Sequence, residues 1–138
     1  IEHLRSLGYQ NIVVIGKSFG GGLTLSLHHE AITKKILWAP AIGFAKENTL
    51  GALQNKPISE IKNLKELKLS PDFIATDKAS LCIIHGTADT AFPVQTSRDI
   101  VSAKPTAQII EVQGADHSFK TTPSEKALIK ATKQSLKG

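Results

Sequence analysis

The chain has 138 residues, of which 41% are hydrophobic and 21% are charged, so it is long and apolar enough to form one domain with a core of its own. This composition excludes a disordered or collagen-like chain, and no apolar run approaches the ~20 residues that a membrane-spanning helix needs. The formal net charge of +5 does not point to a nucleic-acid partner, because the lysines are dispersed along the chain.

The first residues, IEHLRSLGY, read as the last turns of a helix that ends at Gly8, and the chain contains no methionine. We therefore expect the sequence to be a piece of a longer or processed protein, which leaves open whether a signal peptide precedes it. The single cysteine, Cys82, lies inside the apolar run LCIIH. A buried structural thiol is expected there, which favours a reducing, cytoplasmic environment.

Strands and helices alternate along the rest of the chain. Apolar runs predict buried strands at residues 12–15, 35–39, 81–85 and 108–112. Helices are expected at residues 23–29, from Pro93 to about Ala103, and from a capping box in which Thr122 precedes Pro123 and Glu125. This alternation predicts an α/β fold of three layers, with a mostly parallel sheet between helices.

The last predicted helix carries the densest group of lysines. They are spaced to share one of its faces: Lys126, Lys130, Lys133 and Lys137. We interpret this face as solvated rather than as a binding surface.

Residues 43–78 form a longer connection than a simple crossover needs. Apolar residues recur in it at three-residue spacing and predict a short amphipathic helix: Ile58, Ile61, Leu64 and Leu67. We interpret this stretch as a small lid-like insertion over the carboxyl edge of the sheet, where such folds bind their ligands. An ordinary connecting helix on the sheet face is the alternative.

The five residues Gly16-Lys17-Ser18-Phe19-Gly20 fit the G-x-S-x-G pattern of a nucleophile elbow, with an apolar strand before them and a helix after them. A sharp strand-to-helix turn strains the serine backbone and brings neighbouring chain close, so we expect the two flanking glycines to be required for lack of side-chain bulk. The turn would expose the Ser18 hydroxyl and point the Phe19 backbone N–H toward a developing oxyanion.

Two other glycine motifs fail on single residues. A phosphate-binding P-loop ending at Gly16-Lys17-Ser18 requires a glycine where Asn11 stands. A dinucleotide-binding fingerprint starting at Gly16 requires a glycine where Ser18 stands. A purely structural glycine-serine turn remains the alternative to a nucleophile elbow.

A serine hydroxyl needs a base to take its proton and an acid to orient that base. Asp89 follows the third predicted strand and His117 follows the fourth, so both are expected at the same sheet edge as Ser18. The chain order of serine, acid and histidine is the order that the α/β-hydrolase fold uses.

Other acidic residues and histidines are weaker candidates. Asp72 and Asp77 precede the third strand and are expected at the wrong edge, and Asp116 is interpreted as a loop-capping residue. We interpret His85 as a packed, hydrogen-bonded histidine that supports the turn at Asp89. Three further histidines lack metal-ligand spacing, so no metal site is predicted: His3, His28 and His29.

The motifs GKSFGG, LWAPA, HGTADTAFP and GADHSF, in this order, resemble the α/β-hydrolase superfamily over essentially the whole chain. The chain is most similar to small carboxylesterases of the cinnamoyl- or feruloyl-esterase kind, and also to dienelactone-hydrolase and serine-aminopeptidase relatives. The resemblance implies that residues 1–138 are a partial domain, with strands five to eight of eight, lacking the loop that supplies a second oxyanion donor. We therefore expect this polypeptide alone to fold poorly or to have little activity.

The function expected from these residues is cleavage of small-molecule carboxylic esters, with Ser18 as nucleophile, His117 as base and Asp89 as orienting acid. No cofactor is required, and Phe92 is expected to line the substrate pocket. A peptidase or thioesterase of the same fold, or a non-catalytic binding protein, remains the alternative. The oligomeric state is left open.

Overall fold

The computed structural model describes residues 1–44 and 68–137. Eleven elements follow one another along the described chain: α1 (Glu2–Ser6), β1 (Ile12–Lys17), α2 (Phe19–Ser26), β2 (Ile32–Trp38), β3 (Gly43–Phe44), β4 (Lys68–Leu69), α3 (Pro71–Ala75), β5 (Ser80–Gly86), α4 (Val94–Ala103), β6 (Gln108–Val112) and α5 (Thr122–Lys137). No helix of the described residues has both the length and the apolar character needed to cross a bilayer.

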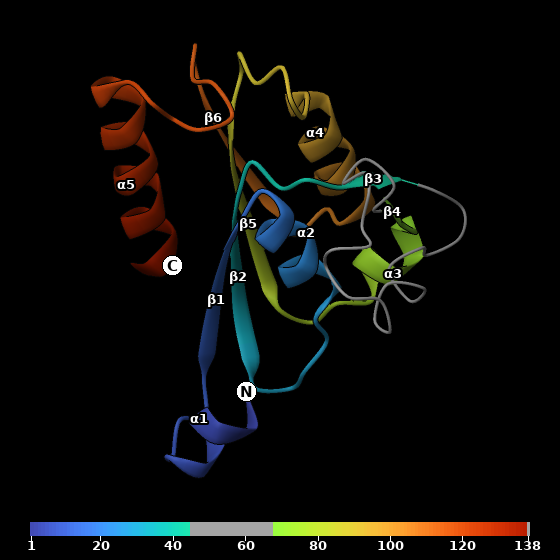
Figure 1. Ribbon diagram of the computed structural model, residues 1–138. Coiled ribbons are helices and arrows are strands. Elements are labelled where there is room, and N and C mark those ends of the chain that lie inside the picture. The colour runs from blue at the N-terminus through green and yellow to red at the C-terminus, as the bar shows by residue number, and fades with distance from the viewer. Residues whose placement is uncertain (45–67, 138) are drawn as a thin grey trace, which may run out of the picture.

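The main sheet has four strands in the order β1-β2-β5-β6, and every neighbouring pair is parallel. Figure 1 shows α5 on one side of this sheet and α2, α3 and α4 on the other. The three-layer arrangement predicted from the alternating elements is therefore confirmed. Because all four strands run the same way, their carboxyl ends share one edge, and the loops that leave that edge are brought together.

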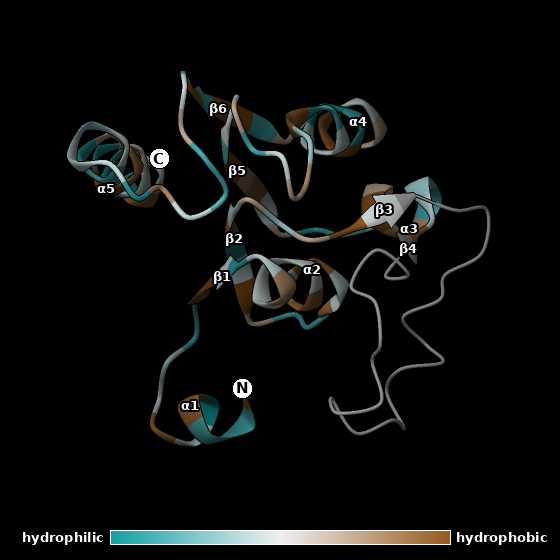
Figure 2. Ribbon diagram, turned by 45° about the horizontal axis from the view of Figure 1, so that its top comes forward, coloured by the Kyte–Doolittle hydropathy of each residue, from teal (hydrophilic) through white to brown (hydrophobic). Residues whose placement is uncertain are grey.

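Alternate residues of β5 supply the cores on the two faces of the sheet. Leu81 and Ile83 belong to the cluster beneath α2, α3 and α4, whereas Cys82 and Ile84 belong to the cluster beneath α5. All four of these side chains are buried, as the continuous apolar run predicted for a strand covered on both faces. Figure 2 shows the same strand as a brown, hydrophobic ribbon between the helical layers. Cys82 is a buried free thiol, as predicted.

Several element bounds differ from the prediction: β2 begins at Ile32 rather than at residue 35, and α2 begins at Phe19 rather than at residue 23. α2 ends at Ser26 rather than at residue 29, because Leu27 adopts an extended backbone with φ −77° and ψ 119°. The cap of α5 is Thr121 rather than Thr122: its hydroxyl accepts a hydrogen bond from the Ser124 N–H at 3.4 Å, and its carbonyl accepts one from the Glu125 N–H at 2.9 Å. The capping motif was recognised one residue late, since adjacent threonines are equivalent in sequence.

Only the two ends of the predicted insertion at residues 43–78 are described. The short strands β3 and β4 pair in parallel and bring these ends together, and α3 follows with Ser70 as its cap. The predicted helix with Ile58, Ile61, Leu64 and Leu67 lies outside the described residues.

Candidate active site

Three of the predicted site residues follow three different strands at the carboxyl edge of the sheet. Ser18 comes directly after β1, Asp89 follows β5, and His117 follows β6. The parallel topology explains why residues so far apart in sequence share one edge.

Ser18 occupies a strained turn between β1 and α2. Its φ of 51° and ψ of −120° lie in a region that residues with a side chain rarely adopt. Hydrogen bonds on both sides hold it there: its N–H donates to the Trp38 carbonyl at 2.9 Å, and its carbonyl accepts from the Gly22 and Ala41 N–H groups at 3.1 and 2.8 Å. The turn therefore fixes the hydroxyl of Ser18 at the sheet edge.

Of the two motif glycines that were predicted to be required for lack of a side chain, only Gly16 meets that requirement. A Cβ on Gly16 would lie 2.4 Å from the Gly20 carbonyl oxygen, so only glycine fits at position 16. A Cβ on Gly20 would meet no atom of the described residues within 4 Å, so the requirement predicted for Gly20 is wrong. The second close approach lies further along α2, where a Cβ on Gly22 would stand 2.7 Å from the Ala41 carbonyl oxygen.

His117 connects Ser18 to Asp89. Its Nε2 lies 2.9 Å from the Ser18 hydroxyl, and its Nδ1 lies 2.7 Å from Oδ2 of Asp89. A carboxylate only accepts hydrogen bonds, so Nδ1 carries the proton and Nε2 has a free lone pair to accept the serine hydrogen. The geometry is that of a serine activated by an oriented imidazole base.

Asp89 is buried with both carboxylate oxygens hydrogen-bonded. Oδ1 accepts from the backbone N–H groups of Ala91 and Phe92 at 2.9 and 2.8 Å. Oδ2 accepts from His117 and also lies 3.1 Å from Nε2 of His85. The side chain of Asp89 has no exposed surface, so these donors replace water around the negative charge.

His85 is fully buried beside Asp89, as a histidine that supports the turn was expected to be. It belongs to β5, and its Nδ1 lies 2.6 Å from the hydroxyl of Ser97 on α4. Ser97 could not be predicted from the sequence, because a polar residue on an amphipathic helix shows no sign of facing a buried histidine.

Asp116 caps the loop that carries His117. Its Oδ1 accepts from the backbone N–H groups of Ser118 and Lys120, each at 3.1 Å. The hydrogen bond from the Lys120 N–H is the largest of the interactions that hold the pKa of Asp116 below its ordinary value. Asp116 is thus a loop-capping residue, in agreement with its interpretation from sequence.

Asp77 lies at the opposite edge, where it pairs with the buried Lys35, a contact that no sequence pattern predicts. Nζ of Lys35 is 2.7 Å from Oδ2 of Asp77, and the Lys35 side chain has no exposed surface. Nζ also donates to the carbonyls of Leu25 and Leu27 at the end of α2. Burial lowers the pKa of Lys35 below its ordinary 10.5, and the nearby Asp77 opposes that shift. The sequence places Lys35 at the start of a predicted buried strand, residues 35–39, but indicates no partner for its charge.

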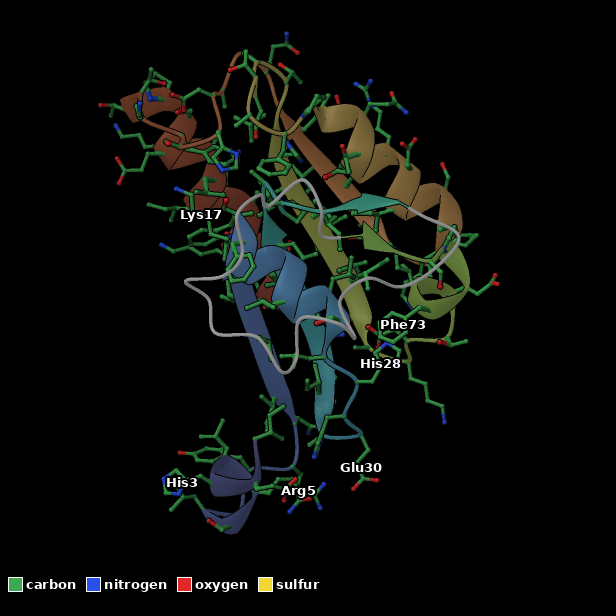
Figure 3. The ribbon with its side chains drawn as sticks, turned by 45° about the vertical axis from the view of Figure 1, so that its right-hand side comes forward. His3, Arg5, Lys17, His28, Glu30 and Phe73 are labelled. Atoms are coloured by element: carbon green, nitrogen blue, oxygen red, sulfur yellow. The ribbon has the colours of Figure 1, made fainter. Side chains whose placement is uncertain are left out.

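The remaining histidines lie away from the triad. The ring of His28 stacks on Phe73 with centroids 4.2 Å apart, and His29 pairs with Glu2 at 2.8 Å. Figure 3 labels His28 and Phe73 side by side, with His3 far away near the chain start. Among the described residues, no three His, Cys, Asp or Glu side chains form a group that could hold a metal ion.

A small cavity of about 300 Å³ lies beside Phe92, whose ring neighbours that of His117. It is lined by Ile42, Gly43, Thr90, Ala91, Phe92, Pro93 and Thr96. The Phe92 ring lies 5.6 Å from the His117 ring, centroid to centroid, so this residue both lines the cavity and neighbours His117. Phe19, the other aromatic residue of the predicted site, begins α2, where the first N–H groups of a helix have no partner within it.

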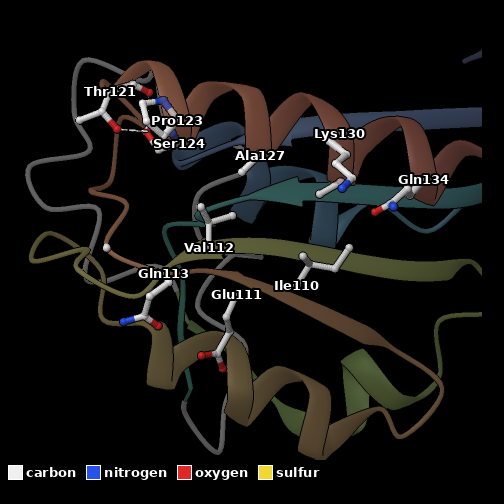
Figure 4. A pocket seen from close by; sticks show the side chains of 12 residues that line it. Ile110, Glu111, Val112, Gln113, Thr121, Pro123, Ser124, Ala127, Lys130 and Gln134 are labelled. Carbon is white, nitrogen blue, oxygen red and sulfur yellow. Dashed lines mark hydrogen bonds between the residues drawn. The ribbon is translucent and has the colours of Figure 1, made fainter.

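A larger hollow lies elsewhere. It has a volume of about 420 Å³ and runs between β6 and α5 (Figure 4). Its lining includes Ile110, Glu111 and Lys130 but none of the three residues Ser18, Asp89 and His117. The lining of the smaller cavity does not include these three residues either, but it contains Phe92, whose ring neighbours that of His117.

A family model matches residues 1–134 and is described as uncharacterised protein family UPF0227. The chain belongs to UPF0227. No curated protein matches this UPF0227 chain.

Solved structures show the fold of this UPF0227 member. A 2-hydroxy-6-oxo-6-phenylhexa-2,4-dienoate hydrolase from Rhodococcus sp. strain RHA1 is 15% identical, with a TM-score of 0.71 over 98% of this chain and 67% of its own. An α/β hydrolase enzyme from the metagenome of Moroccan lagoon sediments is 18% identical, with a TM-score of 0.67 over 96% of this chain and 66% of its own. A thermophilic esterase from Thermogutta terrifontis is 22% identical, with a TM-score of 0.64 over 99% of this chain and 60% of its own.

These likenesses identify the α/β-hydrolase fold. The UPF0227 chain spans between 60% and 67% of the length of these three structures.

Proposed function

We propose that this protein is a serine hydrolase that cleaves carboxylic esters through an acyl-enzyme, with Ser18 as nucleophile, His117 as general base and Asp89 as the acid that orients it. The observation that carries the proposal is the continuous hydrogen-bonded chain from the Ser18 hydroxyl through His117 to Asp89, at 2.9 and 2.7 Å. The strained turn at Ser18 supports it, because strain of this kind persists where the surroundings hold a reactive group in place.

The acylation step follows from these positions. Oγ of Ser18 attacks the ester carbonyl carbon while Nε2 of His117 takes the hydroxyl proton. The carbonyl oxygen becomes an oxyanion, which the Phe19 N–H at the start of α2 is placed to stabilise. The ester C–O bond then breaks, and the imidazolium returns its proton to the departing alcohol.

Deacylation repeats the sequence with water. His117 takes a proton from the water as it attacks the acyl-serine, and returns it to Oγ of Ser18 as the acid product leaves. Asp89 keeps the imidazole in the tautomer with Nδ1 protonated throughout. No redox change occurs, so side chains and backbone groups suffice for the reaction.

Esters are the substrate class that we favour. The esterase from Thermogutta terrifontis shares the fold, and the motif resemblance is to small carboxylesterases of the cinnamoyl- or feruloyl-esterase kind. Relative rates on p-nitrophenyl esters, acyl thioesters and aminoacyl amides test this choice. A preference for thioesters or amides would replace the ester proposal by a thioesterase or peptidase of the same mechanism.

Covalent labelling tests the nucleophile directly. A fluorophosphonate probe should label the full-length protein, and Ser18→Ala should abolish the labelling. Ser26→Ala is the matched control, because Ser26 ends α2, the helix that follows Ser18, and its hydroxyl donates only to the Leu23 carbonyl at 2.7 Å. Labelling that survives Ser18→Ala would refute the proposed nucleophile, and absence of labelling in the unaltered protein would favour a non-catalytic binding role.

A further inference from the structure

The proton on Nε2 of His85 is fixed by its surroundings. Nε2 lies 2.8 Å from the Phe92 carbonyl oxygen and 3.1 Å from Oδ2 of Asp89. One of these oxygens is a carbonyl and the other belongs to a carboxylate, and both kinds of oxygen only accept hydrogen bonds. Nε2 must therefore carry a hydrogen, which it shares between the two acceptors.

The other ring nitrogen of His85 faces a hydroxyl. Nδ1 lies 2.6 Å from Oγ of Ser97, and both side chains are fully buried. Within the described residues, Ser97 Oγ has no other hydrogen-bonding partner. If Nδ1 were the donor, the hydroxyl hydrogen would be left without an acceptor in a buried place, which costs free energy. The Ser97 hydroxyl therefore donates to Nδ1, and His85 is neutral.

We infer that His85 and Ser97 are positioning residues for the acid of the triad: Ser97 fixes the tautomer of His85, whose Nε2–H holds Oδ2 of Asp89 against His117. The inference rests on the function proposed above. It extends the chain of hydrogen bonds from three residues to five, and it gives α4 a role in the alignment of the catalytic base.

His85 and His117 share one acceptor, which is Oδ2 of Asp89. Oδ2 of Asp89 accepts from both His85 and His117, whereas Oδ1 is held by two backbone N–H groups. The carboxylate plane is thus fixed at both ends. Because His85 contributes a hydrogen bond without a positive charge, the full negative charge of Asp89 remains available to the His117 imidazolium that forms during the reaction.

Two substitutions of His85 separate positioning from simple packing. His85→Leu fills the space and removes the donor, and should lower kcat by about 10²-fold, the scale of a small misplacement of a catalytic group. KM for p-nitrophenyl acetate should stay unchanged, because the ester does not contact His85. His85→Gln places an amide N–H near the position of Nε2 and should restore most of kcat.

Ser97→Ala tests the tautomer by itself. It removes one oxygen atom and should lower kcat by about tenfold, as expected for the loss of one buried hydrogen bond in the alignment of the base. Ser102→Ala is the matched control, since Ser102 lies on the same helix, is exposed, and donates only to the Arg98 carbonyl at 3.0 Å. Its kcat should equal that of the unaltered protein.

A proton NMR spectrum provides a measurement independent of turnover. The hydrogen between Nδ1 of His117 and Asp89 should give a strongly downfield resonance that is present in the unaltered protein and in His85→Gln. The resonance should move or disappear in His85→Leu. Unchanged kcat and an unchanged resonance in His85→Leu would overturn the inference, and if that variant does not fold, the same two readouts on Ser97→Ala decide.

Failure of the inference can be told from failure of the proposed function. If Ser18→Ala abolishes fluorophosphonate labelling but the His85 and Ser97 variants turn over normally, only the positioning role is wrong. If Ser18→Ala has no effect on labelling, the proposed function itself is wrong.

Discussion

The hydroxyl of Ser18 lies 2.9 Å from Nε2 of His117, although 99 residues separate them in sequence. The two residues follow β1 and β6, which are the outermost strands of the four-stranded sheet. The loop after β6 must therefore reach back across the ends of β5 and β2 to place the imidazole over the serine. Phe119, with a φ of 55° and a buried side chain, anchors this loop in the core beneath α5.

Asp89→Asn should abolish the proposed activity without unfolding the protein. The amide oxygen can still accept from the Ala91 and Phe92 N–H groups, which places the NH2 where Oδ2 now faces His117. That NH2 would donate to Nδ1 and force the imidazole into the tautomer that cannot accept the serine proton. We expect kcat to fall by about 10⁴-fold.

Steady-state kinetics with p-nitrophenyl acetate measure this loss, and a thermal melt checks the fold. Asp99→Asn is the control, because Asp99 is on the exposed side of α4 and accepts only from the Gln95 side chain at 2.8 Å. Activity of Asp89→Asn within tenfold of the unaltered protein would contradict the role of Asp89.

Gly16→Ala and Gly20→Ala should behave in opposite ways, although both glycines belong to the same motif. A Cβ at position 16 would lie 2.4 Å from the Gly20 carbonyl oxygen, so the strand and helix must move apart. We expect Gly16→Ala to lower the free energy of unfolding by roughly 1–3 kcal/mol. Fluorophosphonate labelling should be lost as well. At position 20 the Cβ has no described neighbour within 4 Å, and alanine should stabilise the helix by about 0.5–1 kcal/mol.

Urea unfolding gives the free energy of unfolding of Gly16→Ala and Gly20→Ala, and fluorophosphonate labelling rates show whether Ser18 stays reactive in each. Equal effects of the two substitutions would show that the motif glycines act through backbone flexibility rather than through the contact at position 16.

The sequence sufficed for the fold and for the residues that meet at the sheet edge. Apolar runs for β5 and β6 are bounded by loops that contain Asp89 and His117, and parallel strands bring such loops to one edge. Hydrophobic periodicity and motif order are both local or sequential signals, so they can be read without coordinates.

Contacts between distant polar side chains could not be read in this way. Ser97 is one of several polar residues on α4, and only the crossing of that helix over β5 places its hydroxyl 2.6 Å from His85. Lys35 looks like an ordinary strand residue, but the chain before β5 brings Asp77 to it. Burial of a charge depends on which partner the tertiary fold supplies, which no local pattern encodes.

Phe92→Ala should weaken activity through the cavity rather than through the triad's hydrogen bonds. Its backbone N–H and carbonyl, which contact Asp89 and His85, remain in place, whereas the ring beside His117 is lost. An aromatic contact of this kind is worth about 0.5–1.5 kcal/mol, so we expect kcat/KM for p-nitrophenyl butyrate to fall by up to about tenfold.

The matched control is Phe73→Ala, which removes a ring that stacks on His28 and lies away from the triad. It should leave kcat/KM unchanged. A larger effect of Phe73→Ala than of Phe92→Ala would place the substrate elsewhere.

Because of the buried pair of Lys35 and Asp77, the free energy of unfolding should depend on pH in the alkaline range. Burial lowers the pKa of Lys35 below 10.5, so the folded protein releases this proton at a lower pH than the unfolded chain does. The unfolded state then binds more protons between the lowered pKa and 10.5, and the free energy of unfolding rises with pH across that window. This stabilising contribution of Lys35 is lost as the pH falls through the pKa that Lys35 has in the folded protein.

Lys35→Met removes this titration and leaves Asp77 without its cation, which should cost roughly 3–5 kcal/mol near neutral pH. Because the titrating amine is gone, the difference in unfolding free energy between the unaltered protein and Lys35→Met should grow from pH 7 toward 10.5. Lys34→Met is the control, since Nζ of Lys34 is only partly buried and donates to the Ser135 carbonyl at 2.6 Å. Urea titrations at a series of pH values measure the difference, and a difference that shrinks as pH rises would show that the Lys35 amine is stabilised in its charged form by the fold.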